Sequence, residues 1–320
     1  MAFWRDVFHQ CFFIPTPTLT EKNLPNQAGR VFIVTGGYAG VGKELCKILY
    51  GKNGTVYVAG RSQEKGDKAL AEIKAAHPSS DGRVEFLKLD LSDLATIKPA
   101  VDEFTRREQR LDVLTNNAGV MQPAQGSKDS HGHELTIGTN CLGPYLLTQL
   151  LTPLLQKTAA SNSPGSVRVT WAASLATSFC PTGGVAWDEQ TGNPKLHGQS
   201  MTNYAQTKGA NVLLAKGYVA QHSKDGIVSN AWNPGNLKSE LQRGMKWFET
   251  FLIAPILFPT YFGAYTELFA GWSEEAGKVD TKAAYIGPWG RFVTLRKDVD
   301  ETKEVERFIE WCEKETKAYR

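Results

Sequence analysis

The hydrophobic positions of this chain fall into short β-branched runs that alternate with stretches of helical spacing. The first run, RVFIVTGG at residues 30–37, ends in two glycines, and VGKELCKILYGKNG follows with Leu45, Ile48 and Leu49 at helical spacing. This order predicts a strand, a turn and a helix. Further strands are predicted near 55–60, 84–89, 111–115, 167–172, 227–232 and 283–287, and helices near 63–76, 92–107, 133–157, 203–222 and 299–318.

Near-continuous apolar strands separated by helices are typical of a parallel sheet that is covered on both faces. We therefore expect an α/β protein with a single doubly wound Rossmann domain at residues 28–320 and a mainly parallel, seven-stranded sheet. Three segments do not fit the alternation: an aromatic-rich N-terminal extension (1–27), an insertion (177–201) and an apolar segment (240–275).

Composition narrows the class of protein. The 320 residues are 41% hydrophobic, enough for a large core, and the net charge of +3 is spread without an aromatic and basic stripe, so we expect no nucleic-acid partner. The five isolated cysteines favour a reducing, cytoplasmic location, and His131 and His133 are interpreted as part of a polar loop, with no metal site. The apolar run 251–265 contains Pro255 and Pro259 and is too short to span a bilayer.

The N-terminal stretch FWRDVFHQCFF has helical spacing of its apolar side chains. Two interpretations are open. Residues 1–20 could make a peripheral contact with a membrane surface, as interfacial helices do. The single firm positive charge, Arg5, favours packing against the body of the protein or a partner subunit instead.

A glycine loop, TGGYAGVG at residues 35–42, follows the first strand and opens the first helix. Small residues in this position let the backbone approach a pyrophosphate at a helix N-terminus, so we expect a dinucleotide cofactor. The second strand ends at Gly60-Arg61-Ser62, with no acid nearer than Glu64. A guanidinium binds a 2′-phosphate that a carboxylate would repel, and Lys65 adds charge, so NADP(H) is favoured over NAD(H). The alternative is an ordinary surface arginine.

Several further motifs follow in order: LDL with Asp90, NNAG at 116–119, GTNCLGP with Asn140, AASLA with Ser174, YAQTK at 204–208 and NPGNLKS at 233–239. Together with the glycine loop, this set resembles the short-chain dehydrogenase/reductase family across about residues 30–240. The chain is most similar to fungal members related to retinol dehydrogenases and the WW-domain-containing oxidoreductase. It departs from the usual pattern at Ala173, where a second serine is common, and at Ser239, where threonine is more usual.

The resemblance implies a catalytic tetrad of Asn140, Ser174, Tyr204 and Lys208. It also implies a cofactor site made of residues from each motif. These are Gly36, Tyr38, Ala39, Val41, Gly42, Arg61, Ser62, Lys65, Asp90, Leu91, Asn117, Ala118, Gly119, Tyr204, Lys208, Pro234, Gly235, Leu237 and Ser239.

The spacing of Tyr204 and Lys208 places both side chains on one helical face. A phenol has a pKa of about 10, and an ammonium about 4 Å away would lower it enough for acid and base work near neutrality. We expect Tyr204 to donate a proton to a carbonyl oxygen that Ser174 also binds, while Lys208 holds the nicotinamide ribose and Asn140 positions a water. The alternative is a chance pair on a solvated helix face.

The segment 240–275 follows the P-G motif, where the family places a mobile cover. We expect a helical lid here, with a substrate-facing set of side chains: Met245, Trp247, Phe248, Phe251 and Leu252. The predicted function is NADPH-dependent reduction of a ketone or aldehyde on a lipophilic or aromatic substrate, as in fungal secondary metabolism. Alternatives are NADP-dependent oxidation of a secondary alcohol and a non-catalytic cofactor-sensing protein. The resemblance also leaves a homodimer or homotetramer open.

Overall fold

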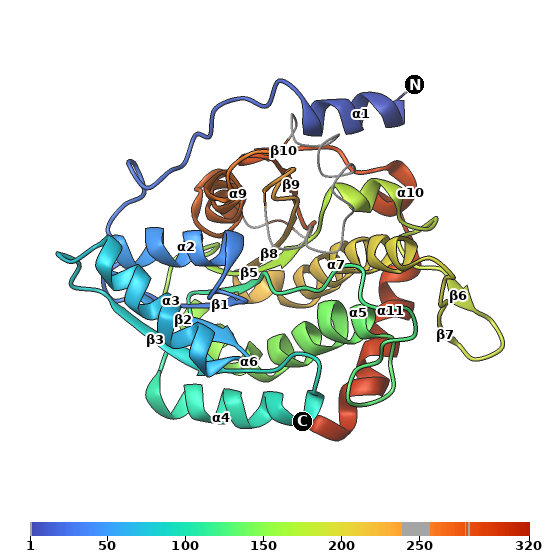
Figure 1. The fold of residues 1–320 in the computed structure, drawn as a ribbon, viewed down its shortest axis with the longest axis horizontal. Helices are drawn as coiled ribbons and strands as arrows, with labels where there is room; N and C mark the ends of the chain where they lie inside the picture. The colour runs from blue at the N-terminus through green and yellow to red at the C-terminus, as the bar shows by residue number, and fades with distance from the viewer. Residues whose placement is uncertain (1, 239–256, 279, 281) are drawn as a thin grey trace.

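The computed structural model of the protein describes residues 2–238, 257–278, 280 and 282–320, with side chains from residue 7 onward. One sheet of eight strands, in the order β10-β9-β8-β5-β4-β1-β2-β3, forms its centre, and helices cover both faces (Figure 1). The strands are β1 (Val31–Thr35), β2 (Thr55–Gly60), β3 (Arg83–Lys88), β4 (Val113–Asn116), β5 (Val167–Ala172), β8 (Ile227–Trp232), β9 (Tyr285–Gly287) and β10 (Arg291–Phe292).

The α/β class and the parallel sheet are confirmed, with one strand more than predicted. All seven predicted strands are present and pair in parallel. The eighth, β10, pairs antiparallel with β9 at the edge of the sheet. Its two residues are too few to show the alternation from which a strand is predicted.

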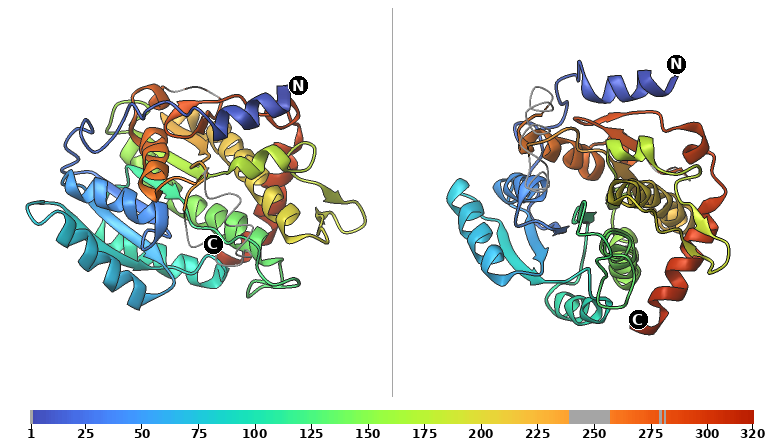
Figure 2. Two further views of the ribbon diagram at one scale, coloured as in Figure 1. Left: turned by 45° about the horizontal axis from the view of Figure 1, so that its top comes forward. Right: turned by 45° about the vertical axis from the view of Figure 1, so that its right-hand side comes forward.

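Alternate residues of the strands enter two different cores, as the pleat of a strand requires. Ile33 and Tyr57 join the core beneath one set of helices, and Phe32 and Val58 join the core on the other face. Figures 1 and 2 show the helices on the two faces of the sheet. The first set is α4 (Ile97–Arg107), α6 (Gly143–Ala159), α7 (Ser200–His222) and α11 (Glu304–Thr316). The second set is α2 (Gly40–Gly51), α3 (Gln63–Ala76) and α9 (Thr260–Trp272).

Shorter elements lie outside these layers: α1 (Ala2–Cys11), α5 (Leu135–Ile137), α10 (Lys297–Asp300) and the hairpin β6 (Trp187–Asp188) with β7 (Asn193–Pro194). The single helix predicted at 133–157 is divided into α5, a π-helical turn at Gly138–Leu142 and α6. A Cβ on Gly138 would lie 2.2 Å from Asp129 Oδ2, and one on Gly143 would lie 2.4 Å from the Leu91 carbonyl oxygen. These close tertiary contacts accompany the break in the predicted helix. The hydrophobic periodicity of the sequence does not reveal them.

The predicted lid range, 240–275, contains a core helix. Helix α9 packs against α2 and the sheet, and Ala264, Leu268 and Phe269 are buried. Ala264 and Leu268 belong to the second core, and Phe269 packs in a smaller cluster with Trp232 and Ile286. Helix α9 therefore belongs to the packed body of the protein, and a lid in the rest of the range stays a prediction. The five predicted lid residues, Met245, Trp247, Phe248, Phe251 and Leu252, lie outside the described residues.

The strand order reverses beside β1, which pairs with both β2 and β4. In a doubly wound sheet the carboxyl ends of the strands at such a point border the ligand crevice. The glycine loop after β1 and the NNAG segment after β4 therefore meet at this crevice. None of the helices in the described part of the chain has the length and hydropathy that crossing a membrane requires.

Candidate active site

The glycine loop is tied to the NNAG segment across the strand reversal. Asn117 Nδ2 donates to the Thr35 carbonyl oxygen at 2.7 Å, and the Ala118 N–H donates to Thr35 Oγ1 at 3.0 Å. A Cβ on Gly42 would lie 2.5 Å from Asn117 Nδ2, so only glycine permits this approach. Gly40 has a φ of 54°, which favours glycine, and no atom lies within 4 Å of the position that its Cβ would take. The loop can therefore approach a pyrophosphate closely.

The end of β2 is arranged around Tyr38. A Cβ on Gly60 would lie 2.0 Å from Tyr38 Cε1, so the tyrosine ring of the glycine loop rests on the bare Cα of Gly60. Arg61 and Lys65 are exposed, and neither side chain forms an ion pair with a described residue. Ser62 accepts a hydrogen bond from the Lys65 N–H and caps α3. Both cations are thus free to meet a phosphate beside the loop.

The segment after β8 lies next to the same loop. Leu237 and Val41 both approach Gly263 of α9, where a Cβ would lie 2.3 Å from Leu237 Cδ1 and 3.0 Å from Val41 Cγ1. Gly235 has a φ of 88°, and its N–H donates to Asn233 Oδ1 at 3.0 Å. Pro234 and Gly235 therefore form a fixed turn. Ser239, the last predicted cofactor residue, is not among the described residues.

Asp90 and Leu91 lie just after β3. Asp90 Oδ1 accepts hydrogen bonds from the Ser92 N–H at 2.9 Å and from Ser92 Oγ at 2.6 Å. The carboxylate is thereby held in place at the carboxyl end of the sheet. Leu91 packs against Gly143 at the start of α6.

Tyr204 and Lys208 lie in α7 with Tyr204 7% exposed and Lys208 4% exposed. Lys208 Nζ donates to the Ala172 carbonyl oxygen at 2.8 Å and lies 5.4 Å from the centroid of the Tyr204 ring. Ser174 follows β5, and its side chain is hydrogen-bonded to Tyr204. These three side chains are brought together, and the alternative of a solvated helix face is wrong.

Asn140 joins the group through the NNAG segment. Its Nδ2 donates to the Val120 carbonyl oxygen and to Thr207 Oγ1, and its Oδ1 accepts from the Val120 N–H at 2.8 Å. Both amide donors are therefore occupied by protein. A Cβ on Gly119 would lie 3.2 Å from Asn140 Oδ1 and 3.5 Å from Lys208 Nζ, so glycine keeps the space beside the lysine clear.

The predicted lowering of the pKa of Tyr204 by Lys208 is not found among the protein groups. Burial raises the pKa of Tyr204 to about 12, against the opposing effect of the hydrogen bond to Ser174. Burial also lowers the pKa of Lys208 to about 8. Desolvation is the largest cause of both pKa shifts, because both groups are removed from water. Near pH 7 the result is a neutral phenol beside a largely protonated amine, which suits a proton donor.

Sequence reasoning missed three residues that hold this site. Tyr285 of β9 donates through its OH to the Ser174 carbonyl oxygen at 3.0 Å. Asn211 Nδ2 donates to the same Ala172 carbonyl oxygen that Lys208 binds, at 2.8 Å. Thr207 Oγ1 links Asn140 to the Tyr204 carbonyl oxygen. Asn211 and Thr207 lie on α7 at helical spacing from Lys208 and Tyr204, a signal that could have identified them.

The polar loop with His131 and His133 fastens the C-terminal helix. His133 bonds Asp129 through Nδ1 and Glu315 through Nε2, and His131 Nδ1 bonds the Tyr319 OH at 2.7 Å. These hydrogen bonds give both histidines a structural role, because they tie the loop to the C-terminal residues.

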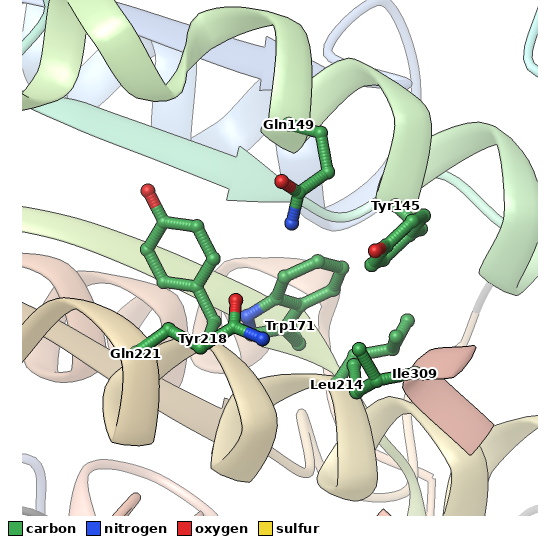
Figure 3. A pocket seen from close by; sticks show the side chains of 7 residues that line it. All are labelled: Tyr145, Gln149, Trp171, Leu214, Tyr218, Gln221 and Ile309. Atoms are coloured by element: carbon green, nitrogen blue, oxygen red, sulfur yellow. The ribbon is translucent and has the colours of Figure 1, made fainter. Parts of the chain in front are cut away.

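A separate small hollow lies between α6, α7 and α11 (Figure 3). Leu214, on its wall, is ten residues beyond Tyr204 in α7, about 15 Å along the helix. Ile309 of α11 closes the hollow and packs against Gly217. The lining side chains are Tyr145, Gln149, Trp171, Leu214, Tyr218, Gln221 and Ile309. The hollow is therefore not part of the site around Tyr204.

A dinucleotide cradle beside a buried tyrosine–lysine pair defines a nicotinamide-dependent oxidoreductase. A family model described as short chain dehydrogenase matches residues 30–171. A short-chain dehydrogenase/reductase from Phomopsis amygdali is 44% identical over 99% of this chain and 96% of its own length. The short-chain dehydrogenase/reductase bet4 from Neocamarosporium betae is 39% identical over 96% of this chain and 92% of its own. The chain belongs to the short-chain dehydrogenase/reductase family, whose members use NAD(P)(H).

Solved structures share the fold. An uncharacterised protein from Mycobacterium paratuberculosis matches with a TM-score of 0.67 and 26% identity over 94% of this chain and 98% of its own. The RhlG/NADP complex from Pseudomonas aeruginosa matches with a TM-score of 0.64 and 22% identity over 81% of this chain and 95% of its own. These curated relatives are fungal proteins, and they do not single out the retinol dehydrogenases or the WW-domain-containing oxidoreductase.

Proposed function

We propose that the protein uses NADPH to reduce a ketone or aldehyde on a lipophilic or aromatic secondary metabolite to the alcohol. The observation that carries the proposal is the neutral, buried phenol of Tyr204, hydrogen-bonded to Ser174 and next to Lys208 at the carboxyl end of the sheet. Reduction of a carbonyl needs a proton donor at that place, and a phenol with a pKa of about 12 retains its proton at neutral pH.

Each side chain has a role in this reaction. Tyr204 donates its proton to the carbonyl oxygen, and Ser174 Oγ donates a hydrogen bond to the same oxygen. The ammonium of Lys208 stabilises the phenolate that Tyr204 becomes, and it holds the ribose in the space that Gly119 keeps clear. Bound NADPH would supply the hydride. Asn140 holds the segment after NNAG against α7 through its hydrogen bonds to Val120 and Thr207. Asn140 also positions a water that relays protons from Lys208 to solvent in the proposed reaction.

The cofactor and the substrate class rest on different parts of the structure. Arg61, exposed and unpaired within the described chain at the end of β2, supports the choice of NADP(H). Helix α1 packs against the 3-10 turn Leu175–Phe179, which follows Ser174. Exposed aromatic rings occur on α1 (Phe8), directly after it (Phe12) and on the turn (Phe179). Such rings support a lipophilic substrate. The fungal relatives support a place in secondary metabolism.

Two other functions have weaker support. Oxidation of an alcohol would need Tyr204 as a base, which burial opposes by raising its pKa. A cofactor-sensing protein without chemistry would have no need of a tyrosine–lysine pair hydrogen-bonded to Ser174.

The proposal is tested by following NADPH and NADH absorbance with a panel of aromatic and polyketide-like ketones and aldehydes, with the product identified by mass spectrometry. One alcohol formed per NADPH consumed is expected. A protein that binds NADPH but reduces no compound, and oxidises the matching alcohols instead, would contradict it.

A further inference from the structure

The C-terminal end of helix α1 is fastened to the active site. Asn233 Nδ2 donates to Gln10 Oε1 at 2.9 Å, and the two residues are 1% and 4% exposed. Cys11 is also buried, and burial raises the pKa of its thiol. The backbone of the same helix is held as well, because Arg291 of β10 donates to the His9 carbonyl oxygen. The N-terminal extension therefore packs against the body of the protein.

Each residue or element that contacts α1 is itself bonded to, or adjacent to, a residue of the candidate active site. Asn233 holds the N–H of Gly235 through Oδ1, so the amide bridges Gln10 and the Pro234–Gly235 turn. The 3-10 turn Leu175–Phe179, against which α1 packs, begins directly after Ser174. Strand β10, which holds His9, pairs with β9, whose Tyr285 donates to the Ser174 carbonyl oxygen. In Figure 1, helix α1 lies at the edge of the molecule near the label of β10, the strand that binds it.

We propose that α1 forms part of the substrate site, and that Gln10 is a positioning residue that fixes the Pro234–Gly235 turn through Asn233. This proposal rests on the proposed function in that the turn borders the place of carbonyl reduction. An amide in a protein interior has two donors and an acceptor to satisfy. Because Gln10 supplies the acceptor for Asn233 Nδ2, its loss leaves a buried donor unpaired and the turn free to shift.

The effect should fall on the carbonyl substrate more than on the cofactor. The adenosine half of the nucleotide is expected at Arg61 and the glycine loop, and the ribose at Lys208. The hydrogen bond described for Gln10 goes to Asn233, whereas that of Lys208 goes to Ala172. A loosened turn therefore disturbs the end of the site where the carbonyl meets the nicotinamide. The KM for the carbonyl should rise while the Kd for NADPH changes little.

The test compares Gln10→Met, which keeps the shape and helix preference but removes the acceptor, with Gln190→Met. Gln190 lies between β6 and β7 with an exposed side chain, and the hydrogen bond described for it is made by its backbone N–H. For the carbonyl that the wild type reduces fastest, Gln10→Met should raise KM about tenfold. The Kd for NADPH should change less than about threefold, with Tm lowered by less than about 5 °C. Gln190→Met should leave all three unchanged.

A second readout does not depend on activity. Maleimide labelling of Cys11, read by mass spectrometry, should be slow in the wild type, slower still with NADPH bound, and about tenfold faster in Gln10→Met. If no carbonyl is reduced, the proposed function fails, and protection of Cys11 by NADPH decides whether α1 is coupled to the site. If Gln10→Met does not fold, a chain without residues 1–11 replaces it, with the same rise in KM expected. Unchanged KM in the variant, or unchanged labelling, would overturn the proposal.

Discussion

In the proposed reaction, Lys208 combines burial with two tasks, holding the ribose and supporting the charge left on Tyr204. Burial lowers its pKa to about 8, so the free enzyme loses the ammonium as the pH rises through this value. We expect kcat/KM for NADPH, which reports groups of the free enzyme, to be constant below about pH 7 and to fall above about pH 8. In Lys208→Arg, a charge that persists at high pH should remove this fall, although the absolute rate is lower. A wild-type profile that is flat to about pH 9.5 would show that Lys208 does not titrate there.

The proposed preference for NADP(H) rests on Arg61. A charge-assisted hydrogen bond to a phosphate is worth about 1.5–3 kcal/mol, so Arg61→Ala should raise the Kd for NADPH by about tenfold to a hundredfold. The Kd for NADH should change less than about threefold, because NADH lacks the 2′-phosphate. Fluorescence titration measures both, and Arg106→Ala, another exposed arginine, serves as the control. Equal wild-type affinities for the two cofactors would contradict the assignment.

At the scale of single elements, α9 contains an acid that the proposed chemistry does not use. Glu267 is fully buried, and neither carboxylate oxygen has a hydrogen-bond partner in the described part of the chain. Burial raises its pKa well above the ordinary value of 4.5, so the folded protein retains a proton that the unfolded chain releases. Stability from this group is thus full below about pH 4.5 and declines as the pH rises toward the raised pKa.

Glu267→Gln, which resembles the protonated acid, should remove that decline. We expect the free energy of unfolding of the variant to exceed that of the wild type by a margin that grows between about pH 5 and pH 8. The growth is at most about 1.4 kcal/mol per pH unit. Urea unfolding at several pH values measures the difference, with the exposed Glu274→Gln as the matched control. A difference that stays constant with pH would contradict a protonated Glu267.

The elements could be predicted to different extents from the sequence. The seven parallel strands were accessible because each carries its own apolar run. The break between α5 and α6 was not, because it accompanies close packing of Gly138 against Asp129 and of Gly143 against Leu91, which hydrophobic periodicity does not reveal. Helix α9 was placed in a lid because its aromatic residues suit either a cover or a core, and only tertiary packing distinguishes the two.

On the scale of the whole molecule, the sequence motifs identified the residues of the candidate site but not the residues that hold them in place. Tyr204, Lys208, Ser174 and Asn140 were recognisable from residue types in order along the chain. Tyr285 and Gln10 were not, since they reach the site from β9 and from the N-terminal helix, and no local pattern reports such distant contacts. The electrostatics also differed from expectation, because burial of Tyr204 and Lys208 is a property of the fold and not of their spacing.

The central claim is that Tyr204 donates the proton in an NADPH-dependent carbonyl reduction. The most direct measurement is NADPH oxidation with the best carbonyl of the panel, compared between the wild type and Tyr204→Phe. Phenylalanine fills nearly the same space but has no proton to give. We predict a fall in kcat of at least about a hundredfold, with the Kd for NADPH and the Tm nearly unchanged. A Tyr204→Phe enzyme that keeps most of its turnover would contradict the account.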